Sequence, residues 1–182
     1  MCHHRAVEAE ARPVRRAQPA DAAGIGLVHV RSWQAAYRGL IPQDFLDHLD
    51  PAKRAEGWRQ YLDGGPRARE ALLVSDGETG VDGFALVGPS RDEDGANGPG
   101  EVYAFYVLPQ RWRRGVGRQL MAAALDALGG LGFGEATLWV LEGNDRGRRF
   151  YEAVGWRADG ATKTEAPQGF SITEVRYRYR IR

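Results

Sequence analysis

The 182-residue chain has few of the features that would crosslink it or anchor it in a membrane. It contains one cysteine, Cys2, which excludes an intrachain disulfide framework and a cysteine-rich zinc site and is typical of a reducing compartment. No apolar run approaches the roughly 18 residues of a membrane span. Residues 1–12 also lack the apolar core of a signal peptide. We therefore expect a cytoplasmic protein with no membrane partner and no metal site.

Net charge is also nearly absent. The 25 basic and 24 acidic residues leave a formal charge of +1, so the chain lacks the overall field that attracts nucleic acid. All the basic residues except Lys53 and Lys163 are arginines, which reflects either coding bias or phosphate recognition. With 43% hydrophobic and 27% charged residues, the composition is that of a globular protein. The length predicts one domain over residues 13–182, preceded by a disordered tail over residues 1–12.

Apolar periodicity and turn residues predict a mixture of helices and strands. The unit formed by residues 101–108, 115–128 and 136–141 is strand, helix, strand, so its two strands should be parallel. We further expect helices over residues 21–37, 42–49, 50–62 and 144–154, strands over residues 13–17, 71–74, 83–87 and 172–182, and a polar surface loop over residues 89–100.

The most informative segment is Val-Leu-Pro-Gln-Arg-Trp-Arg-Arg-Gly-Val-Gly-Arg, residues 107–118. It joins a strand to a helix start, where free N–H groups and the helix dipole favour an anion such as pyrophosphate. A dinucleotide fingerprint would need glycine where Leu120 stands, and no nucleotide P-loop follows. A loop with solvated arginines is the alternative. The glycines and arginines concerned are Arg111, Arg113, Arg114, Gly115, Gly117 and Arg118.

A second block, Asn-Asp-Arg-Gly-Arg-Arg-Phe-Tyr-Glu-Ala-Val-Gly-Trp, spans residues 144–156. Together with Gly115-x-Gly117 it resembles the GNAT superfamily of N-acetyltransferases, whose patterns are Gln/Arg-x-x-Gly-x-Gly/Ala and Asn-x(3–5)-Ala-x-x-Phe-Tyr-x-x-x-Gly-Phe. Trp112 departs from the family by standing at its Gln/Arg position, and we interpret it as packing within the loop. The resemblance implies an α/β (α+β) fold with a mixed, mostly antiparallel sheet of six to seven strands, a parallel central pair and about four flanking helices.

By this resemblance the protein is an acetyl-CoA-dependent enzyme that transfers acetyl to a primary amine by direct attack. The acceptor is a small-molecule or protein amine, and the protein could act as a monomer or as a homodimer. The two central strands would splay to admit the pantetheine arm, which backbone groups would hold as an added strand. The implied cofactor-binding residues are Phe105, Tyr106, Val107, Arg113, Arg114, Gly115, Val116, Gly117, Arg118 and Asn144, of which Asn144 would also cap its helix.

Tyr151 is the predicted general acid. Helical spacing places Phe150, Ala153 and Val154 on the buried face and leaves Tyr151 about 100° round the helix. In the family the matching tyrosine lies near the CoA sulfur, and a phenol with a pKa of about 10 can protonate a departing thiolate. A core tyrosine is the alternative interpretation.

Glu101 is the predicted general base, because some histone-acetylating relatives carry a glutamate six residues before the position of Val107. Strand alternation places it on the face of Phe105 and Val107. An alkylamine of pKa near 10 is mostly protonated at neutral pH, so attack on a thioester needs a base. Water and Glu142 are alternatives. Other relatives carry an acidic residue at the position of Trp139. Because tryptophan cannot accept a proton as a carboxylate does, we do not expect a base at this position.

Trp33 and Tyr37 lie in a segment that resembles bacterial members of the superfamily. In the fold of that family this region forms a wall of the acceptor pocket, although both rings could equally belong to the hydrophobic core. Two other functions remain: a non-catalytic acyl-CoA-binding or sensing module, and an arginine-rich nucleic-acid binder. The balanced charge argues against the nucleic-acid binder.

Overall fold

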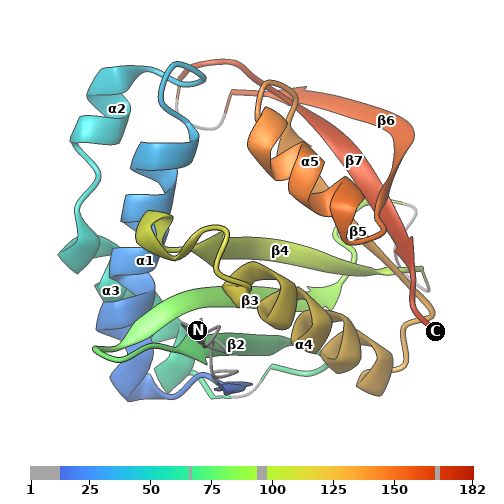
Figure 1. Cartoon of the computed structure of the whole chain (residues 1–182), viewed down its shortest axis with the longest axis horizontal. Helices are drawn as coiled ribbons and strands as arrows, with labels where there is room; N and C mark the ends of the chain where they lie inside the picture. The colour runs from blue at the N-terminus through green and yellow to red at the C-terminus, as the bar shows by residue number, and fades with distance from the viewer. Residues whose placement is uncertain (1–12, 66, 94–97, 167–168) are drawn as a thin grey trace, which may run out of the picture.

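The computed structural model describes residues 13–65, 67–93, 98–166 and 169–182. The predicted tail, residues 1–12, and part of the predicted loop over residues 89–100 lie outside the described residues. Figure 1 shows a single sheet with helices packed on it. The strands are β1 (Val14–Arg16), β2 (Ala71–Asp76), β3 (Val81–Pro89), β4 (Gly100–Val107), β5 (Glu135–Leu141), β6 (Arg157–Glu165) and β7 (Ile172–Arg180), and the helices are α1 (Ala22–Ala36), α2 (Gln43–Asp47), α3 (Pro51–Asp63), α4 (Val116–Gly130) and α5 (Asp145–Ala153).

The seven strands follow the order β1-β2-β3-β4-β5-β7-β6. The β4–β5 pair is parallel, and the other five pairs are antiparallel. The predicted mixed sheet with a parallel central pair is therefore confirmed. None of the helices in the described ranges is long and apolar enough to cross a membrane.

Alternation along β2 and β3 builds two cores, one on each face of the sheet. Leu73 and Ala85 join a cluster beneath α4, whereas Leu72 and Phe84 join a second cluster with Ile25 of α1. Because successive strand residues point to opposite faces, the nearly continuous apolar runs reflect a sheet covered on both sides. Figure 1 shows α4 and α5 over one face.

A β-bulge in β4 changes the predicted position of Glu101. Leu86 of β3 lies opposite Ala104, but the next residue, Val87, lies opposite Val102, so Tyr103 is an extra residue on β4. One extra residue reverses the alternation beyond it. Glu101 therefore shares a face with Ala104 rather than with Phe105 and Val107, and the prediction from simple alternation is wrong.

Two further elements differ from the sequence prediction. The strand β6 was not predicted, because its residues are mostly polar and exposed and give no alternating apolar signal. It pairs only with β7, at the edge of the sheet. Asp21 precedes α1, but its carboxylate does not cap the helix. It accepts hydrogen bonds from the Arg15 guanidinium at 2.8 and 2.9 Å and from the Gln18 N–H at 2.8 Å.

Candidate active site

The central feature of the site is the opening between β4 and β5. These strands pair only from Gly100 to Val102 on β4, so the β5-facing edge of the rest of β4 has no strand partner. The Leu108 N–H donates to Asp82 O on the β3 side. Because main-chain groups alternate in direction along an antiparallel strand, those of Phe105 and Val107 face the opening.

One of these main-chain groups, the Val107 carbonyl, already has hydrogen-bond partners within the protein. The Val107 carbonyl accepts hydrogen bonds from Trp112 Nε1 at 2.8 Å and from Ser32 Oγ at 3.0 Å. The Arg146 guanidinium lies 4.1 Å from the centroid of the Trp112 ring. These contacts confirm the interpretation of Trp112 as a packing residue of the loop. Among the described residues, no strand or side chain is paired with the main-chain groups of Phe105 or with the N–H of Val107.

The start of α4 has the geometry of an anion site. Gly115 precedes the helix with a φ of 85°, and no side chain from the described part of the chain caps the helix. The first helical bond runs from the Gln119 N–H to Gly115 O, so the N–H groups of residues 116–118 have no partner within the helix. Around them, Arg113, Arg114 and Arg118 are exposed, whereas Arg111 donates to the Asp82 carboxylate at 3.1 Å.

The two glycines of the loop differ in what they do. A Cβ on Gly115 would meet no atom within 4 Å, so its left-handed backbone is what favours glycine there. A Cβ on Gly117 would lie 3.2 Å from the Phe150 ring. Gly117 therefore also allows α4 and α5 to pack closely.

The environment of Tyr151 corrects the predicted buried face of α5. Tyr151 is buried and Ala153 is exposed, because the helix lies against a cluster of aromatic rings. The Tyr151 ring centroid lies 6.2 Å from that of Tyr177 and 6.3 Å from those of Phe105 and Trp156. Asn144 caps the helix by accepting a hydrogen bond from the Gly147 N–H at 3.0 Å, as predicted.

Three tyrosine hydroxyls from different elements influence one another. Burial, reinforced by Tyr106, raises the pKa of Tyr151. Burial also raises the pKa of Tyr37, with further contributions from Tyr106 and Tyr151. Tyr151 belongs to α5, Tyr106 to β4, and Tyr37 follows α1, so the opening is where they meet. A raised pKa keeps the Tyr151 phenol protonated at neutral pH, as a proton donor must be.

A small cavity of about 100 Å³ is lined by two of these residues, Tyr37 and Tyr106, and we call it the aromatic pocket. Trp33 and Tyr37, the predicted acceptor-wall residues, both line it. Glu174 of β7 contributes a carboxylate, which lies 3.3 Å from Lys163 Nζ. Glu174 could not be singled out from the sequence, because it occupies an ordinary polar position of an alternating strand. The full lining is Trp33, Tyr37, Ile41, Tyr106, Leu141, Phe170, Ile172 and Glu174.

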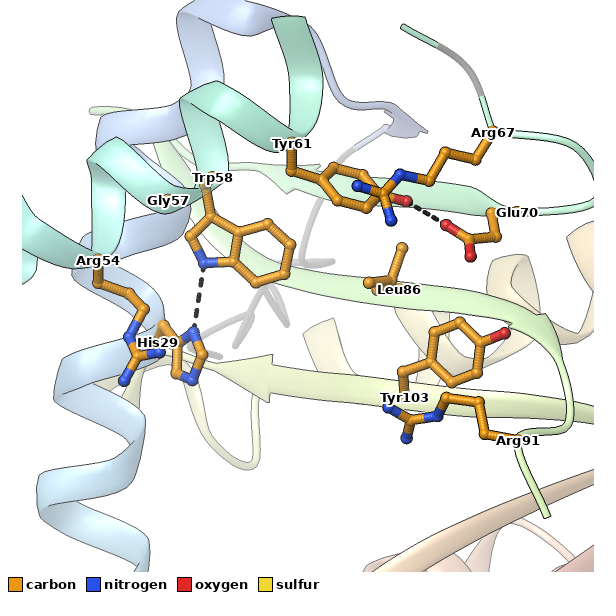
Figure 2. A pocket seen from close by; sticks show the side chains of 10 residues that line it. All are labelled: His29, Arg54, Gly57, Trp58, Tyr61, Arg67, Glu70, Leu86, Arg91 and Tyr103. Atoms are coloured by element: carbon orange, nitrogen blue, oxygen red, sulfur yellow. Dashed lines mark hydrogen bonds between the residues drawn. The ribbon is translucent and has the colours of Figure 1, made fainter. Parts of the chain in front are cut away.

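A larger cavity of about 390 Å³ lies on the same face of the sheet, between α1, α3, β3 and β4, and we call it the arginine pocket (Figure 2). No sequence motif marks it, since its residues are scattered from position 29 to position 103. Its lining residues are His29, Arg54, Gly57, Trp58, Tyr61, Arg67, Glu70, Leu86, Arg91 and Tyr103.

Glu101, the predicted base, is 2% exposed and is held by Arg91. One carboxylate oxygen accepts from the Arg91 main-chain N–H at 2.8 Å, and the other accepts from the guanidinium at 2.5 Å. Within the described chain, neither pocket lining includes Glu101 or the exposed Glu142. The carboxylate that lines the aromatic pocket with Tyr37 and Tyr106 is that of Glu174.

Comparison with known proteins agrees with this geometry. Residues 32–156 match the model of the Acetyltransferase (GNAT) family. The Bacillus subtilis (strain 168) protein named uncharacterized N-acetyltransferase YuaI is 35% identical over 164 residues, which cover 90% of this chain and 87% of that protein.

Two solved structures are similar in fold. PaiA N-acetyltransferase from Thermoplasma acidophilum, in complex with coenzyme A, has a TM-score of 0.70 at 18% identity and covers 92% of this chain and 98% of its own. YncA from Salmonella typhimurium, with its cofactor acetyl-CoA, has a TM-score of 0.69 at 20% identity and covers 94% of each chain. The chain therefore belongs to the GNAT acetyltransferase family and is an acyltransferase, as its two sequence blocks predicted.

Proposed function

We propose that this protein transfers the acetyl group of acetyl-CoA to a primary amine by direct attack, with Tyr151 as the general acid. The observation that carries the proposal is the position of Tyr151. Its ring lies 6.3 Å from that of Phe105 on β4, burial raises the pKa of its phenol, and Tyr106, which lines the aromatic pocket, contributes to that rise. A protonated donor between a groove for the acyl donor and a pocket for the amine is what thioester aminolysis requires.

The residues around the opening fit acetyl-CoA. The uncapped N–H groups of residues 116–118 and the exposed Arg113, Arg114 and Arg118 suit its pyrophosphate. The free main-chain groups of Phe105 and the Val107 N–H suit an extended pantetheine arm paired as an additional strand. When bound there, acetyl-CoA supplies a thioester carbonyl, and the Phe105 N–H is placed to stabilise negative charge on its oxygen.

The aromatic pocket suits the amine. Its rings attract an ammonium group through their faces, and the Glu174 carboxylate adds an opposite charge. An alkylamine must lose a proton before it attacks. Glu174, or Glu101 acting through water, accepts that proton, and Tyr151 gives its own proton to the departing sulfur. The cytoplasm, whose reducing environment suits a chain with one cysteine, is the proposed location.

The donor site can be tested by thermal unfolding. Acetyl-CoA at 100 times its dissociation constant should stabilise the protein by about 2.7 kcal/mol. Gly115→Ala should reduce this shift strongly, because alanine disfavours the φ of 85° that shapes the loop. Gly130→Ala, at the other end of α4, has open space for its Cβ and should keep the full shift. An equal shift in all three proteins would argue against the loop as the pyrophosphate site.

The role of Glu101 can be separated from its contact with Arg91. If Glu101 is the base, Glu101→Gln lowers the rate at neutral pH, and the loss shrinks as rising pH supplies free amine. Arg91→Gln should instead cost about 1–2 kcal/mol of unfolding free energy, because it leaves a buried carboxylate with fewer partners. Because Arg91 is the ion-pair partner of Glu101, its loss would also change the pH–rate profile if Glu101 were the base, so this variant serves for the stability measurement alone. An unchanged profile in Glu101→Gln would exclude Glu101 as the base and favour Glu174 or water.

The non-catalytic alternative makes a different prediction. A binding or sensing module would bind acetyl-CoA and release no CoA with any amine. A thiol-release screen of several amine classes therefore separates the two functions.

A further inference from the structure

The arginine pocket has one end with uncompensated positive charge. Arg54 of α3 lines this end, and within the described parts of the chain no carboxylate lies within ion-pair distance of it. Figure 2 shows its guanidinium beside the ring of His29. At the opposite end, Tyr61 donates to the Glu70 carboxylate at 2.6 Å, and Arg91 is paired with Glu101. Arg67 also lies at that end, over the Tyr61 ring at 4.4 Å, but there Glu70 supplies a negative charge to the same lining, whereas no carboxylate of the described lining residues lies beside Arg54.

His29 adds a second donor beside Arg54. Trp58 Nε1 donates to His29 Nδ1 at 3.2 Å, so the neutral ring carries its proton on Nε2. Burial, with the nearby charge of Arg54, lowers the pKa of His29 to about 3, which keeps the ring neutral at physiological pH. A neutral N–H and a guanidinium side by side are a donor set for a carboxylate.

This end of the arginine pocket adjoins the aromatic pocket. Arg54 lies 6.0 Å from the centroid of the Trp33 ring, and Trp33 lines the aromatic pocket. His29 stands one helical turn before Trp33, and its ring stacks on Tyr106 with centroids 5.0 Å apart. Tyr106 lines the aromatic pocket as well. Arg54 and His29 therefore adjoin Trp33 and Tyr106, two rings of the pocket proposed for the amine.

The remainder of the arginine pocket is largely apolar. Trp58, Leu86 and Tyr103 contribute its walls, and Arg91 stacks over Tyr103 at 4.3 Å. Figure 2 shows these side chains around a common hollow. A volume of about 390 Å³ is large enough for an apolar side chain or stem.

We infer that the acceptor is an amine that also carries a carboxylate, and that Arg54, with His29, is the specificity-determining site for that carboxylate. This inference rests on the proposed acetyl transfer and names its substrate class. The amine occupies the aromatic pocket, the carboxylate lies at the Arg54 end of the arginine pocket, and an apolar part of the acceptor extends along Trp58 and Tyr103. Amines without an anionic group are expected to be poorer substrates.

The test compares each carboxylate-bearing amine with its neutral amide. Suitable pairs are L-phenylalanine and L-phenylalaninamide, 4-aminobutyrate and 4-aminobutanamide, and 6-aminohexanoate and 6-aminohexanamide, which vary the distance between amine and carboxylate. For each pair, kcat/KM is measured by CoA release with wild type and with Arg54→Gln. The ratio of carboxylate to amide should fall roughly 10- to 100-fold in the variant for the best pair, the usual effect of a hydrogen bond to a charged group. Because each compound is compared between two proteins, differences in amine pKa cancel.

The loss should appear mainly in KM, because a contact remote from the reacting atoms binds the ground state and the transition state alike. Arg54→Lys keeps the charge and should retain part of the preference. Arg59→Gln is the matched control, since Arg59 is exposed on the same helix and pairs with Glu56 at 2.6 Å. It should leave every ratio unchanged.

The outcomes distinguish this inference from the proposed function. Turnover of amines with the same carboxylate-to-amide ratio in wild type and Arg54→Gln would overturn the carboxylate site and leave acetyl transfer intact. CoA release with none of these compounds, nor with simple alkylamines, would overturn acetyl transfer and the inference with it.

Discussion

Replacing Tyr151 with phenylalanine should slow the acetyl-transfer step by about 100- to 10,000-fold, the usual contribution of a positioned general acid. The free energy of unfolding should change by less than about 1 kcal/mol. The ring keeps its contacts with Phe105, Trp156 and Tyr177 in the variant. Within the described residues the hydroxyl has no hydrogen bond that the substitution would break. The measurement is kcat by CoA release, together with the unfolding midpoint of the same protein.

Tyr177→Phe is the matched control. Tyr177 is fully buried beside Tyr151, but its hydroxyl accepts from Arg148 at 3.2 Å and donates to Glu152 at 2.7 Å. The control should therefore lose about 1–2 kcal/mol of stability and keep its turnover per folded molecule. Single-turnover kinetics must show that product release does not mask the chemical step. Full activity in Tyr151→Phe would remove Tyr151 from the mechanism and favour a core role.

Gly26→Ala should destabilise the protein by about 3 kcal/mol or more, because it forces main chain against main chain. A Cβ on Gly26 of α1 would lie 2.6 Å from Ala55 N and 2.7 Å from Pro51 O, both on α3. Helix main chain cannot rotate aside as a side chain can, so α3 would have to move away from α1. Arg54 and His29 lie at this contact, so the arginine pocket should change with it.

Gly57→Ala serves as the control for this substitution. Gly57 lies on the same helix α3, is exposed, and has open space for a Cβ. Removing a helix-interior glycine there should stabilise the protein by about 0.5–1 kcal/mol. Denaturant midpoints of both variants provide the measurement. An unchanged midpoint for Gly26→Ala would mean that the two helices are not packed as closely as the structure describes.

Much of the fold could be predicted from local patterns. The loop around Gly115 and the cap at Asn144 are set by residues that are neighbours in the chain, so a motif can record them. The strand β6 could not be predicted, because an exposed edge strand needs no apolar alternation. The buried face of α5 was also predicted wrongly. Helical spacing gives the angles between side chains around the helix axis, but it does not say which of these side chains face the sheet.

The sequence by itself determined the family and the glycine-containing loop at the start of α4, because both are local patterns of residue type and spacing. Through the family resemblance it also made Tyr151 the candidate acid. Only the tertiary structure decided on which face of the sheet Glu101 lies. The bulge at Tyr103 arises from the pairing of β3 with β4, and the residue pattern of neither strand alone predicts it. The aromatic and arginine pockets also exist only in the tertiary structure. Their residues come from elements far apart in the chain, and a cavity exists only where such elements pack without filling the space between them.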